Sequence, residues 1–176
     1  MYNFLNLDQQ TRSFMLDAIN EAIESGNIYY STRFNELGKK QWLPLLKQAV
    51  LEYDEHWLAF KLEENQLLKN LEGAQKPSGG YTIEHVPDIA AETIAEGQFN
   101  RFYILGLCKL AKSKGISELI VYRAKESKNP RTESESLINT RISINETESQ
   151  LLEIESSFKS KLVQPNSGIS MRLPKY

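Results

Sequence analysis

The hydrophobic residues of the first 72 positions recur at intervals of three and four, the spacing that predicts amphipathic helices. The first predicted helix covers about 8–25, with Asp8 placed to cap its N-terminus. Two more are predicted at about 43–53, where a proline stands in the first turn, and at about 54–72. Residues 1–72 are therefore predicted to form a helical part.

After a glycine-rich segment, the pattern changes from helical spacing to alternation. Residues 73–80, GAQKPSGG, contain no large hydrophobic residue and are predicted to be a linker. Residues 81–176 are predicted to form a part that contains both helices and strands. Its predicted strands are 81–86, 119–124, 137–144 and 169–173, and its predicted helices are 87–97, 98–114 and 145–158.

The pattern predicts an α+β fold in which a helical N-terminal half packs on a small mixed β-sheet with two helices. The two parts are expected to form one compact unit, because each alone would have a small core. Residues 98–114 are hydrophobic around nearly the whole circumference of the predicted helix, so this helix is expected in the core. It contains the only cysteine, Cys108, which is expected to be a buried thiol.

Length and composition fit an ordinary globular protein, with 176 residues, 40% hydrophobic and 25% charged. No stretch approaches the roughly 18 consecutive apolar residues of a membrane span, and the N-terminus lacks the pattern of a secretory signal. A single cysteine cannot form an internal disulfide, which suits a reducing compartment. A cytoplasmic protein without membrane contact is therefore expected.

Motifs for catalysis, metals and cofactors are not found in the sequence. His56, His85 and Cys108 do not reproduce the spacing of a zinc site. KPSGGYT lacks the G-x-x-x-x-G-K-[ST] pattern of a phosphate-binding loop and does not precede a predicted helix, and no G-x-S-x-G nucleophile motif occurs. No metal, cofactor or catalytic residue is therefore predicted.

The charges are strongly segregated along the chain. Residues 1–100 carry 8 Lys and Arg against 15 Asp and Glu, whereas residues 101–131 carry 8 against 2. A basic segment of this kind attracts an anionic partner. The candidate binding residues, which lie with Lys114 in this segment, are Arg101, Arg123, Arg131, Lys109, Lys112, Lys125 and Lys128.

Arg123 has two interpretations, because it stands at the end of a predicted central strand on the same face as apolar residues. An arginine in that position must be paired. An internal ion pair is slightly favoured, with Glu92, Glu96, Glu133 or Glu135 as its partner. The alternative is a guanidinium fork that binds a phosphate or carboxylate of a partner.

Three blocks resemble, in the same order, a group of small bacterial proteins of unknown function. The blocks are FNRFYILGLC (99–108), VYRAKESKNPRTESE (121–135) and PNSGISMRL (165–173), and LDQQTRSFML near the N-terminus also fits. The resemblance covers most of the chain and implies a stand-alone bacterial or mobile-element protein. It implies no activity.

The expected function is a non-enzymatic binding protein that docks on a macromolecule through the basic surface at 101–131. A protein partner or a second copy of the chain is favoured over RNA or DNA, because the chain as a whole is acidic. The third hypothesis is a small enzyme with a site formed by Arg101, Arg123, Arg131 and Glu135.

Overall fold

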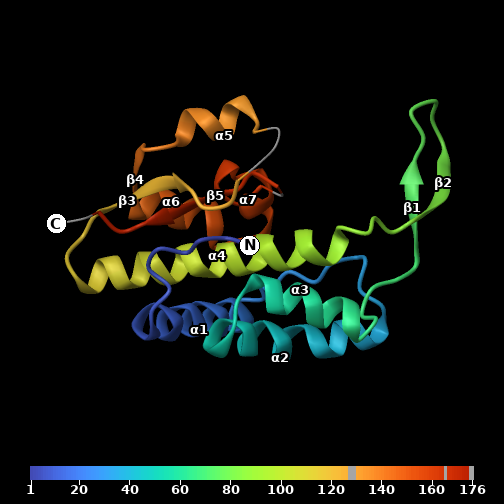
Figure 1. The fold of residues 1–176 in the computed structure, drawn as a ribbon, viewed down its shortest axis with the longest axis horizontal. Coiled ribbons are helices and arrows are strands. Elements are labelled where there is room, and N and C mark those ends of the chain that lie inside the picture. Colours follow the sequence, from blue (N-terminus) through green and yellow to red (C-terminus); the bar gives the residue numbers. More distant parts are fainter. Residues whose placement is uncertain (127–129, 165, 175–176) are drawn as a thin grey trace.

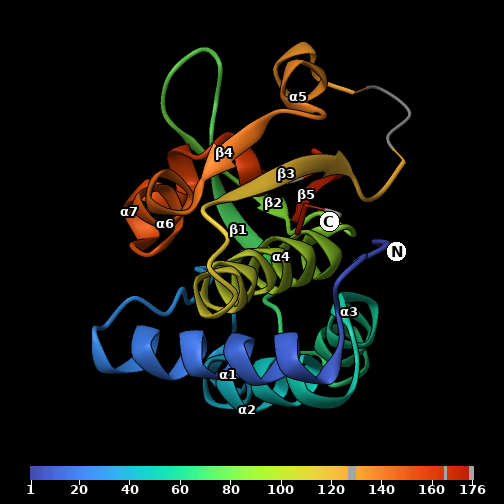
Figure 2. The same cartoon turned by 90° about the vertical axis from the view of Figure 1, so that its left-hand side faces the viewer.

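A computed structural model describes residues 1–126, 130–164 and 166–174. Three layers are stacked on one another, with a single long helix, α4, in the middle (Figures 1 and 2). Helices α1, α2 and α3 cover one side of α4, and a three-stranded sheet with short helices covers the other. The α+β class with a helical N-terminal half is confirmed.

The N-terminal layer contains α1 (Gln9–Glu24), α2 (Glu36–Glu52) and α3 (Glu55–Glu64). The α1 prediction is confirmed with its cap, since the Asp8 side chain accepts a hydrogen bond from the third residue after it. The α2 prediction began seven residues too late, at 43 instead of Glu36. Asn35 caps this helix, and Pro44 lies in its interior rather than in its first turn.

Helix α4 (Ala90–Ser113) is 24 residues long and joins the two helices predicted at 87–97 and 98–114. Its middle section is buried on all sides, as expected from the sequence, and Cys108 is 0% exposed within it. Helix α1 packs very closely on α4 at Gly106. A Cβ atom at Gly106 would lie 2.9 Å from the backbone nitrogen of Met15, so only glycine fits there.

A hairpin of two antiparallel strands, β1 (Leu71–Gln75) and β2 (Tyr81–His85), stands away from the body (Figure 1). The predicted helix at 54–72 was therefore wrong in its second half, because α3 ends at Glu64 and a strand begins at Leu71. The segment expected to be a linker, 73–80, supplies the end of β1 and the turn of this hairpin.

The C-terminal layer is built on a sheet with the order β4-β3-β5, which is antiparallel rather than mixed as predicted. The central-strand prediction for β3 is confirmed, and so is the edge strand β5, whereas the strand predicted at 137–144 is only three residues long. The predicted helix at 145–158 is divided into α6 and α7. The bounds are β3 (Glu118–Arg123), α5 (Thr132–Leu137), β4 (Arg141–Ser143), α6 (Ile144–Leu151), α7 (Ile154–Lys159), a 3-10 helix (Lys161–Val163) and β5 (Ile169–Arg172).

Candidate functional site

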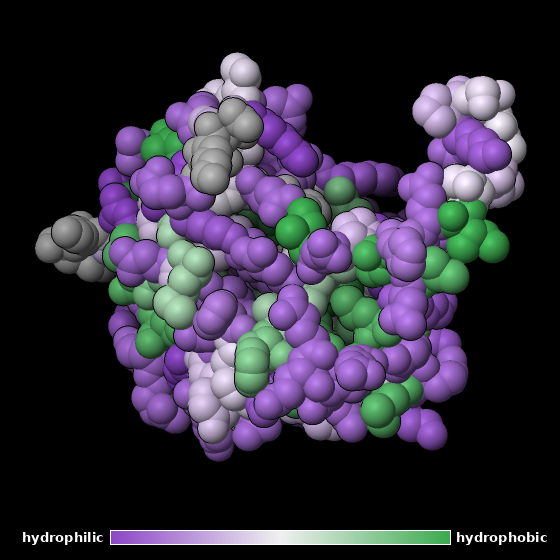
Figure 3. Space-filling model, turned by 45° about the vertical axis from the view of Figure 1, so that its right-hand side comes forward, coloured by the Kyte–Doolittle hydropathy of each residue, from purple (hydrophilic) through white to green (hydrophobic). Residues whose placement is uncertain are grey.

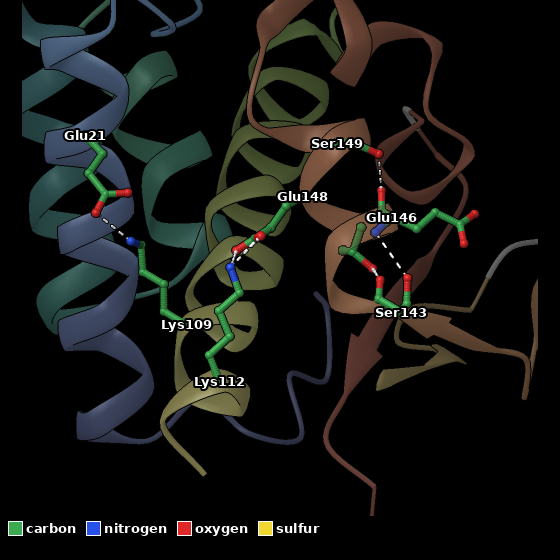
Figure 4. Close-up of polar contacts among 8 residues, drawn as sticks. Glu21, Lys109, Lys112, Ser143, Glu146, Glu148 and Ser149 are labelled. Carbon is green, nitrogen blue, oxygen red and sulfur yellow. Dashed lines mark hydrogen bonds and ion pairs between the residues drawn. The ribbon is translucent and has the colours of Figure 1, made fainter. Parts of the chain in front are cut away.

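The lysines of the basic segment on α4 are paired with acids from neighbouring helices. Lys109 Nζ lies 2.6 Å from Glu21 on α1, and Lys112 Nζ lies 2.6 Å from Glu148 on α6 (Figure 4). In the sequence, Glu21 precedes the basic segment and Glu148 follows it. Much of the segregated charge is therefore neutralised inside the fold.

Lys125 is held in the same way at the other end of α4. Its ammonium group lies 2.6 Å from Glu92 and also contacts Glu96, which is almost fully buried. Burial raises the pKa of Glu96, and the bond to Lys125 offsets only part of this effect. Glu96 and Lys112 are 16 residues apart on one helix, or about 24 Å at 1.5 Å per residue. The structure does not bring these lysines together.

The internal ion pair predicted for Arg123 is confirmed, with Glu135 as the partner. Arg123 also donates to the backbone carbonyl of Ser167. Arg131 donates to the side-chain oxygen of Gln164 at 2.9 Å. Of the arginine and glutamate set considered for an enzyme, only Arg123 and Glu135 are joined through their side chains in the described structure, while the Glu135 amide donates to the Arg131 carbonyl at 3.0 Å. Lys128 lies outside the described residues.

Arg101 lies in the core, where its guanidinium binds backbone carbonyls. It is 0% exposed and donates to Leu151 at 2.8 Å, to Leu152 at 2.7 Å and to Asn27 at 3.2 Å. Leu151 and Leu152 stand at the C-terminal end of α6, where the last carbonyls of a helix lack intrahelical donors. Arg101 therefore caps the end of α6 and ties it to α4 and to the loop that follows α1, out of reach of an external partner.

A cleft of about 310 Å³ is the feature that best fits a binding site. It lies between the base of the hairpin, the N-terminal half of α4 and helix α7, and Figure 3 shows hydrophobic side chains near the base of the hairpin. Its volume is at the lower end of the range for small-molecule sites. The lining residues are Tyr29, Ser31, Thr32, Arg33, Glu72, Thr93, Ile94, Gly97, Gln98, Ser157, Phe158, Val163 and Gln164.

The two charged residues of the cleft neutralise each other. Arg33 donates to both carboxylate oxygens of Glu72, at 2.7 and 2.8 Å. This bidentate contact lowers the pKa of Glu72 and raises that of Arg33. It also anchors the hairpin to the body, since Glu72 belongs to β1 and Arg33 to the loop before α2.

An aromatic pair forms another part of the wall. The rings of Tyr29 and Phe158 meet edge to face, with centroids 5.0 Å apart and planes at 82°. Phe158 nevertheless remains 58% exposed. Part of its ring surface is therefore available to a molecule in the cleft.

Helix α4 contributes Thr93, Ile94, Gly97 and Gln98 to the wall of the cleft. Gln98 is only 8% exposed, and its Oε1 has no hydrogen-bond partner among the described residues. A buried polar atom left without a partner costs about 1–3 kcal/mol. A Cβ atom at Gly97 would meet no described atom within 4 Å. A glycine inside a helix costs about 1 kcal/mol relative to alanine, and here no packing contact requires it.

The hydroxyl groups of the cleft belong to Tyr29 and to serines and threonines. Neither histidine nor Cys108 is among its lining residues. Burial raises the pKa of the Cys108 thiol to about 12, which keeps it protonated. Within the described residues, no group of three or more His, Cys, Asp or Glu side chains is placed to hold a metal ion.

Sequence reasoning did not find the cleft, and the one local signal was Gly97, which it interpreted as a break between two helices. In the part of the chain that the structure describes, no helix is both long and apolar enough to cross a membrane. No protein-family model matches the chain, and searches of curated proteins and of solved structures likewise find no match. The resemblance to small bacterial proteins therefore stays a prediction.

Proposed function

We propose that the protein is a non-enzymatic binding protein and that the cleft between the hairpin, α4 and α7 is its binding site. The observation that carries this proposal is the cleft itself, which has a volume of about 310 Å³ and a wall that includes the exposed ring of Phe158 and the mutually neutralised pair Arg33 and Glu72. A ligand that covers the exposed part of the Phe158 ring would remove apolar surface from water.

Gly97 supports the same proposal. Glycine is unfavourable inside a helix. At position 97 a Cβ would meet no described atom within 4 Å, so the effect of the missing side chain is to leave open space in the cleft. Selection for stability alone favours alanine at such a position. Selection for an open cleft favours glycine.

The test is fragment binding followed by protein NMR. A library of small fragments should shift backbone amide signals of residues 29–33, 93–98 and 157–164, and Gly97→Leu should abolish these shifts by filling the cleft. Gly73→Leu is the matched control, because a Cβ at Gly73 also meets no described atom and Gly73 does not line the cleft. Fragment shifts that survive Gly97→Leu, or a library without any cleft binder, would contradict the proposal.

Docking of a macromolecule on the basic segment is the second candidate. It is favoured by an open depression of about 450 Å³ that is bordered by Arg123 and Lys125. Titration with fluorescent RNA and DNA at low and moderate salt tests the nucleic-acid form of this hypothesis, since such binding weakens steeply with salt. Absence of binding at low salt would eliminate it and leave an acidic protein as the partner to be tested.

A further inference from the structure

We propose that the outer edge of β2 docks a second copy of this chain, so that two hairpins join through their β2 strands into one four-stranded antiparallel sheet. The hairpin stands away from the three layers, and β2 is its outer strand (Figure 1). A two-stranded hairpin by itself is only marginally stable in water, whereas three or more strands with an apolar face are stable. Pairing with a second copy supplies the strands that one chain lacks.

The outer edge of β2 has free backbone groups. At the tip of the hairpin the Lys76 amide donates to the Gly80 carbonyl, and at the base the Val86 amide donates to the Asn70 carbonyl, both at 3.0 Å. Bonded and non-bonded residue pairs alternate along an antiparallel ladder, so these two bonds determine which groups of β2 point away from β1. The outward-pointing amides and carbonyls belong to Tyr81, Ile83 and His85.

These groups are unprotected in the part of the chain that the structure describes. The backbone hydrogen bonds outside the hairpin ladder do not involve residues 81–85. Natural proteins protect such an edge with lysine, proline, a bulge or a covering segment. Residues 81–85, YTIEH, contain no lysine or proline, and they pair with β1 without a bulge. The strand also begins with Tyr, Thr and Ile, which favour strands, whereas β1 contains Gly and Ala.

Hydrophobic side chains accompany the free edge. Tyr81 is 81% exposed and Ile83 is 74% exposed, the two highest values among the large hydrophobic side chains that the structure describes. They share one face of the hairpin with the exposed Leu71, because Leu71 pairs with His85 and side chains alternate along a strand. Cross-strand contacts between aromatic and β-branched side chains stabilise a sheet. A strand added to β2 gains such contacts as well as backbone hydrogen bonds.

The sequence of β2 suits pairing with itself. An antiparallel pairing centred on Ile83 uses all five residues: Ile83 meets the same residue of the second copy, Tyr81 meets the second copy's His85, and Thr82 meets its Glu84. No acid then lies opposite another acid across the new pair. A parallel pairing in register would place Glu84 beside itself, and like charges directly opposite each other are destabilising. The charges therefore favour a two-fold symmetric dimer, the commonest form of homo-oligomer.

Sedimentation velocity of the full chain over a wide range of concentrations tests the proposal. The interface is a single strand pair, and small interfaces belong to weak or transient complexes, so a concentration-dependent equilibrium of monomer and dimer is expected. Ile83→Lys and Ile83→Glu should each weaken association at least about 10-fold, because like charges meet at the centre of the sheet. An equimolar mixture of the two variants should associate more tightly than either alone. Phe60→Lys is the control, since Phe60 is equally an exposed apolar residue but lies on α3.

A pair of proline variants tests which edge is used. The Ile83 amide makes no bond within the hairpin, so Ile83→Pro should keep the hairpin and remove the central donor of the new pair. Gly73→Pro makes the same change directly opposite, on the outer edge of β1. Association should be weakened by Ile83→Pro and should survive Gly73→Pro.

Cysteine cross-linking tests the register. Residues at the centre of the new pair have Cα atoms about 5.5 Å apart, within the range of a disulfide. Ile83→Cys should therefore form a disulfide-linked dimer under mild oxidation. Tyr81→Cys is the matched control, because the two copies of that position lie four residues, or roughly 13 Å, apart along the strands. The natural Cys108 is 0% exposed and should not contribute.

Each outcome decides the proposal. A monomer at every concentration would overturn it, and so would a dimer that Ile83→Lys and Ile83→Pro leave unchanged, because that dimer uses another surface. A mixture of Ile83→Lys and Ile83→Glu that associates no better than its components would overturn pairing centred on Ile83, as would equal cross-linking of Ile83→Cys and Tyr81→Cys.

Discussion

Replacement of Arg101 by methionine should destabilise the protein strongly, because Arg101 serves the fold from inside the core. Methionine is unbranched and nearly fills the same space, so the change removes the charge and the donors without opening a large cavity. Three carbonyl groups lose their donor, those of Leu151, Leu152 and Asn27.

The magnitude follows from the burial of these three bonds. The bond to Leu151 is buried, so its carbonyl should cost about 1–3 kcal/mol when unpaired. The bonds to Leu152 and Asn27 are only partly buried, so water can replace the donor at a cost of about 0.5–1.5 kcal/mol each. The sum of roughly 2–6 kcal/mol is reduced because methionine avoids the desolvation of a guanidinium. A loss of about 2–4 kcal/mol is expected.

Urea denaturation followed by circular dichroism measures this loss as a shift of the midpoint at constant slope. Arg101→Lys keeps the charge but not the planar fork, so it should lose part of the same free energy. Arg141→Met is the control, since Arg141 is exposed and its contact with Glu118 is 3.7 Å long, and its effect should stay within about 0.5 kcal/mol. A loss below about 1 kcal/mol for Arg101→Met would refute the structural role.

Three further predictions concern close packing, a buried acid and the thiol. Gly106→Ala should lower the free energy of unfolding by about 1–3 kcal/mol, because the new Cβ collides with the Met15 backbone. Gly97→Ala should raise the free energy of unfolding by up to about 1 kcal/mol. If denaturation gave the same change in free energy for both variants, the close packing of α1 on α4 would be contradicted. Burial raises the pKa of Glu55 above its ordinary value of 4.5. The folded protein therefore holds the Glu55 proton more tightly than the unfolded chain, which stabilises the fold fully below pH 4.5. This contribution to stability is lost as pH rises from 4.5 through the folded-state pKa. Glu55→Gln should therefore gain stability relative to the natural protein as pH increases above 4.5, and a pH-independent difference would refute this. Cys108 should react slowly with a thiol reagent in the native protein and fast in urea; rapid native labelling would show that α4 is not buried.

Local signals were sufficient for the elements whose stability is local or whose pattern is long. Asp8 identified the start of α1, and the apolar circumference of 98–114 identified the buried part of α4. Both signals depend on residues within a few turns of each other, so no knowledge of the rest of the fold was needed.

Helical spacing failed where a remote contact overrode it. Leu67 and Leu68 continue the apolar spacing of α3, which is why a helix to residue 72 was expected. In the structure the chain leaves the helix at Gln66, which has a positive φ of 52°, and Leu68 then forms a bridge with Phe34. Leu67 is buried outside a helix, and its carbonyl accepts a hydrogen bond from the amide of Asn35, 32 positions away.

The basic segment shows the same limit for charge. Residues 101–131 have an excess of six positive charges over negative ones, and residues 1–100 an excess of seven negative ones. Counting along the chain cannot show that Lys109 reaches Glu21 across 88 residues, or that Lys125 reaches Glu92 across 33. Complementary excesses in neighbouring segments are a sign of internal pairing as much as of a charged partner.

The cleft could not be predicted because five separate segments contribute its walls, from the loop before α2 to the end of the 3-10 helix. The information for it is nevertheless partly present at Gly97. A glycine between two helical patterns predicts a break, yet α4 continues through it, which means that tertiary packing of the helix outweighs the local cost. A glycine that neither ends a helix nor permits close packing needs another explanation, and the free space above Gly97 supplies one.

Gly106 shows the contrast on the same helix, because there the missing Cβ is required by α1. Two glycines nine residues apart thus have different physical causes, and only the structure distinguishes the glycine that keeps a cleft open from the one that lets two helices meet.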